Sequence, residues 1–98
     1  MALNWQAFTS PVLLRGDAKT AYRDPAVFYR NGCFYLYFTL VETEEDGTVY
    51  LYLAMTTSTD LVHFTPVRKL SERDRALNYS SPGNIIRFGG RFCLCCQT

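Results

Sequence analysis

The sequence predicts an all-β fold, and more narrowly the blades of a β-propeller. First, residues 24–37 return in altered form as residues 81–95, with Pro82 standing 57 residues after Pro25. Second, seven Tyr and seven Phe in 98 residues suit half-buried strands better than helices. Third, no segment shows the apolar spacing at i, i+3 and i+4 that predicts a helix. A period of this length, made of strands and turns, is typical of a propeller blade.

The repeat also makes a specific prediction about its second strands. After one inserted residue the shift becomes 58, which aligns Phe34 and Leu36 with Phe92 and Leu94. We expect each aligned pair to occupy equivalent positions on the second strands of two successive hairpins, because side chains alternate strictly along a strand.

Turn signals separate the expected strands. Asn31-Gly32 predicts a type I′ hairpin turn, residues 42–47 an acidic turn, and residues 58–60 a turn in which side chains bond to nearby backbone. Pro66 interrupts the last strand, which suits the edge of a sheet. In chain order, we expect strands at residues 5–14, 27–30, 33–41, 48–56 and 63–70.

The domain organisation follows from the same pattern. Residues 8–14 echo residues 64–70, so we expect residues 5–14 to be an outer strand without the rest of its own blade. One blade cannot bury both faces of its sheet, and the chain ends inside an expected strand. The sequence therefore predicts the N-terminal part of one propeller domain, whose partners are the missing blades of its own full-length chain. A complete interaction module is disfavoured. The predicted parts are an outer strand with its connection (1–21), blade 1 (22–80) and the start of blade 2 (81–98).

Net charge and cysteine content limit the classes of function that the sequence can support. A net charge of +1 gives no electrostatic argument for binding nucleic acid or an anionic membrane, and no apolar run approaches the roughly 20 residues of a membrane span. The four cysteines lack zinc-type spacing, so we interpret them as reduced, small core residues, with a disulfide or metal role as the weaker alternative. No cofactor is expected. Without a visible signal peptide, the sequence favours a cytoplasmic protein.

Three segments, in this order and spacing, carry a family resemblance: RDPAV at residues 23–27, GCFYLYFT at residues 32–39 and STDLVHF at residues 58–64. They resemble the opening of glycoside hydrolase family 43, whose members are five-bladed propeller enzymes that include arabinofuranosidases and xylosidases. The resemblance covers almost the whole chain, although Phe64 stands where the family usually has Trp. The related invertase-like families usually show Asn-Asp-Pro-Asn-Gly, which this chain does not match.

The resemblance implies a hydrolase that cleaves pentose-containing glycans, with Asp24 as the general base. Family 43 enzymes invert configuration, so one carboxylate activates water while a second carboxyl group, about 6.5–9.5 Å away, protonates the leaving oxygen. In the family that acid is a Glu from a later blade, and we assign the role to none of Glu42, Glu44, Glu45 and Glu72. Two alternatives stay open. Asp24 could be an ordinary turn residue before Pro25, or the propeller could bind carbohydrate without catalysis.

Smaller signals complete the expected site. Tyr22, Phe28 and Tyr79 flank the presumed funnel and could stack on a sugar ring, with core packing as the default for Phe28. Asp60 belongs to the turn that closes the blade, where we expect a structural role. His63, the only histidine, is expected on the outer strand in a solvated or half-buried position.

Overall fold

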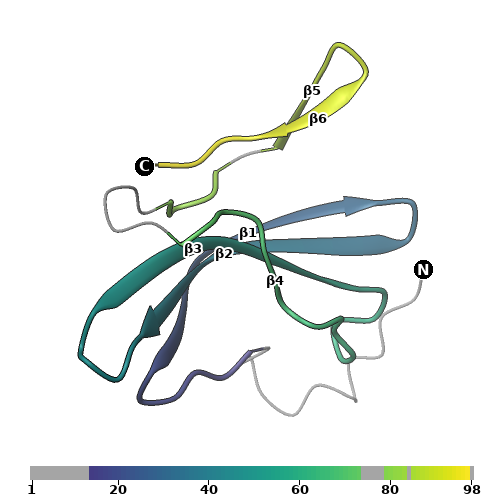
Figure 1. Cartoon of the computed structure of the whole chain (residues 1–98). Helices are drawn as coiled ribbons and strands as arrows, with labels where there is room; N and C mark the ends of the chain where they lie inside the picture. The colour runs from purple at the N-terminus through teal and green to yellow at the C-terminus, as the bar shows by residue number, and fades with distance from the viewer. Residues whose placement is uncertain (1–13, 74–78, 84, 98) are drawn as a thin grey trace.

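The computed structural model of the chain describes residues 14–73, 79–83 and 85–97, in which every regular element is an antiparallel β-strand (Figure 1). A four-stranded sheet has the order β1 (Thr20–Arg30), β2 (Cys33–Thr43), β3 (Val49–Ser58) and β4 (Arg68–Lys69). A separate two-stranded sheet contains β5 (Ile85–Phe88) and β6 (Arg91–Leu94). The predicted all-β class is confirmed. The expected strand at residues 5–14 lies, apart from Leu14, outside the described residues.

The second strands of the two hairpins are equivalent, as the repeat predicts. Phe34 and Phe92 are the second residues of β2 and β6, and Leu36 and Leu94 are the fourth. The two hairpins belong to different sheets. The sequence repeat is therefore also a structural repeat, in which one hairpin motif is used twice.

Both hairpins turn through two residues in the left-handed region. Asn31 has a φ of 52° and Gly32 a φ of 78°, and Gly89 and Gly90 have φ values of 57° and 76°. Positive φ at both central positions defines a type I′ turn, whose twist matches that of the flanking strands. The turn predicted at Asn31-Gly32 is confirmed.

We expect Gly32→Ala to lower the free energy of unfolding by about 1 kcal/mol, measured by urea denaturation. A Cβ at Gly32 would meet nothing within 4 Å, so the loss would come from backbone strain at positive φ alone. Gly83→Ala is the matched control. Gly83 is not at positive φ, and a Cβ there would make an ordinary contact with the Cys95 carbonyl oxygen at 3.7 Å. Equal losses in the two variants would contradict the type I′ assignment.

The core lies on one face of the four-stranded sheet. Cross-strand pairing places Leu40 opposite Tyr52 and Phe38 opposite Ala54, so alternation along β2 and β3 directs these side chains to the same side. The buried cluster comprises Phe38, Leu40, Tyr50, Tyr52 and Ala54, and Leu14 and Tyr22 pack against it. In the described part of the chain, no helix has the length and hydrophobicity that crossing a membrane requires.

Asp60 organises the turn that follows β3. Its carboxylate accepts hydrogen bonds from the backbone N–H groups of Val62 and His63, at 2.9 and 2.8 Å, and lies 2.8 Å from Nδ1 of the His63 ring. The bond to the His63 ring, followed by the backbone bonds, holds the pKa of Asp60 below its ordinary value. These contacts support the structural role expected of Asp60. The side chain of His63 is 86% exposed.

The expected fourth strand at residues 63–70 is wrong in extent, because β4 contains only Arg68 and Lys69. The Asp60 turn holds the chain up to His63 out of extended pairing. Thr65 then bonds to β3 partly through its side chain, since its hydroxyl accepts from the Thr57 N–H at 2.9 Å. Pro66 has no N–H to donate to β3. For these reasons β4 pairs with β3 only at Arg68 and Lys69.

Candidate functional site

Asp24 lies at a β-bulge. Between Arg23 and Ala26 the register of β1 against β2 shifts, so that Asp24 and Pro25 stand opposite a single residue, Phe38. Among the described residues β1 is an edge strand, and an edge strand tolerates a proline without losing a ladder bond. Asp24 has a φ of 55°, a strained conformation for a residue that precedes proline. Bulges of this kind redirect a side chain and are frequent beside active sites.

A chain of hydrogen bonds holds the Asp24 carboxylate. Thr39, which is 1% exposed, donates from Oγ1 to Oδ2 of Asp24 at 2.8 Å. The same Thr39 oxygen accepts from the backbone N–H of Ser81 at 2.7 Å, and the Ser81 hydroxyl lies 3.4 Å from Asp24 Oδ2. Asp24 itself is exposed. The carboxylate is thus oriented by residues that belong to β2 and to the segment before β5.

Ser81 is the counterpart of Asp24 in the repeat. Each residue precedes a proline, and Ser81 has a φ of 52°, close to that of Asp24. Equivalent residues of two repeated units therefore contact each other directly. Next to them lies a groove of about 490 Å³, which is lined by Pro25, Ala26, Val27, Phe28, Pro82, Gly83, Ile85 and Ile86.

The three aromatic residues expected to bind sugar do not converge. Tyr22 packs edge-on against Phe38 in the core, with ring centroids 5.4 Å apart and planes at 74°. Tyr79 lines a different cavity, together with Leu53 on β3. Of the three, Phe28 alone lines the groove that begins at Pro25, beside Asp24.

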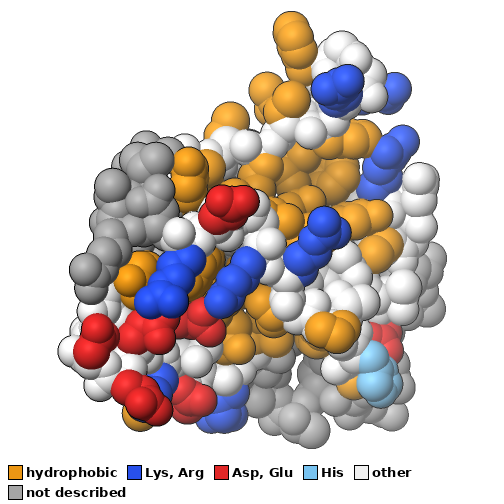
Figure 2. All heavy atoms as spheres, in the orientation of Figure 1, with side chains coloured by type: hydrophobic (Ala, Val, Ile, Leu, Met, Phe, Trp, Pro, Cys, Tyr) orange, Lys and Arg blue, Asp and Glu red, His pale blue; other side chains and the backbone are white. Residues whose placement is uncertain are grey.

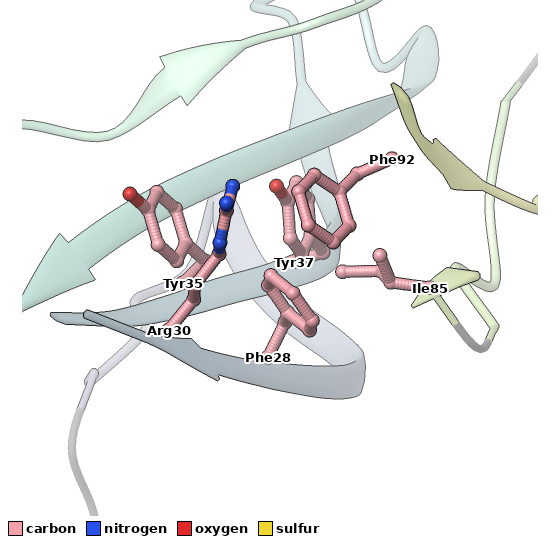
Figure 3. A pocket seen from close by; sticks show the side chains of 6 residues that line it. All are labelled: Phe28, Arg30, Tyr35, Tyr37, Ile85 and Phe92. Atoms are coloured by element: carbon pink, nitrogen blue, oxygen red, sulfur yellow. The ribbon is translucent and has the colours of Figure 1, made fainter. Parts of the chain in front are cut away.

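A second, smaller cavity adjoins the groove, and it was not anticipated from the sequence. It has a volume of about 180 Å³, and it is lined by Phe28, Arg30, Tyr35, Tyr37, Ile85 and Phe92 (Figure 3). We call it the aromatic slot. Its lining on the four-stranded sheet could have been inferred from alternation, since Phe28 pairs with Tyr35 across β1 and β2. The contribution of the second hairpin could not.

Two of the carboxylates near the β2–β3 turn form ion pairs with basic side chains. Glu42 forms an ion pair with Lys69, and Glu44 forms one with Arg73 at 3.2 Å. Figure 2 shows acidic and basic side chains gathered on this end of the sheet, away from the apolar hollow below the second hairpin. Glu42 and Glu44 are therefore used in surface ion pairs.

The four cysteines are unpaired, and three of them are not core residues. Cys93, Cys95 and Cys96 are exposed, which corrects the expectation that they act as small buried hydrophobic residues. They lie on or just after β6, and the described residues provide no further strand to cover that side of the two-stranded sheet. No group of three or more possible metal ligands occurs among the described residues.

Comparisons of the chain with family models, curated proteins and solved structures found no match. The resemblance to glycoside hydrolase family 43 accordingly rests on the three segments of sequence given above.

Proposed function

We propose that this chain is the N-terminal part of an inverting glycoside hydrolase similar to family 43. In this proposal β1 to β4 form the first propeller blade, β5 and β6 begin the second, and Asp24 is the general base. Its substrate would be a pentose-containing glycan. We also propose a reducing compartment such as the cytoplasm, because exposed Cys93, Cys95 and Cys96 would be prone to oxidation elsewhere.

The contact between Asp24 and Ser81 is the observation that supports this proposal most. Units arranged around an axis keep their equivalent residues far apart, except for those residues that lie near the axis. Here the equivalent residues meet through the Thr39 hydroxyl and a 3.4 Å approach of their side chains. Placing Asp24 near the axis of a propeller puts it where the innermost strands converge on a central funnel.

The hydrogen bonds of the Asp24 carboxylate are also compatible with a role as general base. Thr39 and Ser81 approach Oδ2, whereas Oδ1 accepts no hydrogen bond from any described residue. Asp24 is exposed, and a carboxylate held through one oxygen can use the other to hold a water molecule and take its proton. The reaction also needs a carboxylic acid about 6.5–9.5 Å away, which the resemblance assigns to a Glu on a later blade.

The test uses a longer chain that carries the later blades, incubated with aryl arabinofuranosides and xylosides. We expect turnover with inversion, so that NMR detects first the product anomer opposite to the substrate. Retention of configuration would contradict the mechanism. Binding of pentose oligosaccharides without turnover would contradict hydrolysis and support the alternative, a propeller that binds carbohydrate without cleaving it.

A further inference from the structure

The aromatic slot is small, but it has room for one aromatic ring. An apolar protein cavity of about 150 Å³ is sufficient to hold a benzene ring. The slot, at about 180 Å³, has room for one such ring with a small substituent. Phe28 and Phe92 lie with ring centroids 5.1 Å apart, and Phe28 and Tyr35 with centroids 6.1 Å apart. The planes of these two pairs of rings are inclined at 53° and 44°, so the rings offer both edges and faces to a further aromatic ring.

Three polar groups stand on one side of the slot. In Figure 3 the guanidinium of Arg30 and the hydroxyls of Tyr35 and Tyr37 point to the same side, with the rings of Phe28 and Phe92 beside them. Burial, with Tyr35 as a second cause, raises the pKa of Tyr37 above its ordinary value. A tyrosine hydroxyl keeps its proton at neutral pH, and this shift favours the protonated form further, so the hydroxyl can donate a hydrogen bond.

Arg30 is a cation without an acidic partner among the described residues. Its guanidinium carbon lies 4.5 Å from the centre of the Phe92 ring, and none of the ion pairs among the described residues involves it. Lys69 and Arg73 differ in this respect, since each also stacks on a tyrosine but pairs with a glutamate. A guanidinium fork recognises a carboxylate through two parallel hydrogen bonds.

We propose that the aromatic slot binds a small aromatic carboxylate. The ring of the ligand would lie against Phe28 and Phe92, and its carboxylate would accept hydrogen bonds from Arg30 and Tyr37. This proposal does not depend on hydrolysis at Asp24, because the slot is built from other side chains. A few converging polar groups on an apolar cavity are the usual composition of such sites.

The first test titrates the 98-residue chain with benzoate and follows backbone amide signals by NMR. We expect shifts confined to β1, β2, β5 and β6. Benzamide has the same shape without the charge, and we expect it to bind at least about tenfold more weakly, because it lacks the charge-assisted bonds. Cyclohexanecarboxylate keeps the charge without the aromatic ring and should also bind more weakly. The proposal is overturned if benzoate does not bind at millimolar concentration, or if benzamide binds equally well.

Two pairs of variants localise the site. Arg30→Gln should weaken benzoate binding about tenfold or more, whereas Arg15→Gln, an equal loss of charge at an exposed position before β1, should not change it. Phe92→Ala removes a wall of the slot, and Phe88→Ala removes an exposed ring of the same hairpin as its control. If Phe92→Ala fails to fold, as judged by circular dichroism, the Arg30 pair decides. Wild-type affinity in Arg30→Gln would overturn the proposal.

Discussion

Asp24→Asn, in a longer chain that carries the general acid, should lower kcat by about 10² to 10⁴-fold with little change in KM. A general base must accept a proton from water, and an amide of the same shape cannot do so. The fold should be kept, because an Asn side-chain oxygen still accepts from the Thr39 hydroxyl, and Asn tolerates positive φ. Steady-state kinetics on an aryl pentoside, with thermal melting of both proteins, measures the two effects separately.

The matched control for this substitution is Asp46→Asn. Asp46 is an exposed turn residue whose Oδ1 accepts from the Thr48 N–H at 2.9 Å, so its replacement should leave kcat unchanged. If Asp24→Asn also kept wild-type kcat, the role of Asp24 would be to shape the bulge in β1, since Asn forms the same local bonds. Loss of activity together with a lower melting temperature would mean that Asp24 stabilises the bulge of β1, and would not support a role in proton transfer.

Local signals predicted the hairpin turns. They placed the first strand of the sheet at residues 27–30, which is shorter than β1, and they failed at the fourth strand for a physical reason. Asn31-Gly32 specifies its turn through the φ values that two neighbouring residues adopt, and no distant contact is needed. The extent of β4 depends instead on hydrogen bonds between side chain and backbone, such as the one from the Thr57 N–H to the Thr65 hydroxyl. Such bonds compete with the strand ladder, and a hydrophobic pattern does not encode them.

In the candidate site, too, the sequence could not predict the contacts that depend on how the two hairpins are placed relative to each other. The repeat aligned Asp24 with Ser81, but an alignment cannot say that two equivalent residues touch, because that depends on how the units are placed around each other. The aromatic slot was missed for this reason too, since Phe92 reaches Phe28 only when the second hairpin packs on the first sheet. Tyr22 was expected at the funnel, yet alternation along β1 sends its ring to the Phe38 side.

Phe38→Ala is expected to have the largest effect on stability. Phe38 is 3% exposed, it belongs to the buried cluster, and its ring supports the edge of Tyr22. Removing a buried phenylalanine side chain costs about 3–5 kcal/mol, through lost transfer free energy and the cavity that remains. Small domains have a total stability of about 5–15 kcal/mol, so this single change would remove a large share of it.

Urea denaturation of Phe38→Ala beside Phe88→Ala measures this effect against a chemically identical change. Phe88 is 75% exposed, and its truncation should alter the free energy of unfolding by no more than about 0.5 kcal/mol. If Phe38→Ala is too unstable to give a baseline, Phe38→Leu keeps most of the volume and should lose about 1.5 kcal/mol. Comparable losses at Phe38 and Phe88 would mean that the face carrying Phe38, Leu40 and Tyr52 is not the core of the sheet, because burial would then no longer determine the cost of truncation.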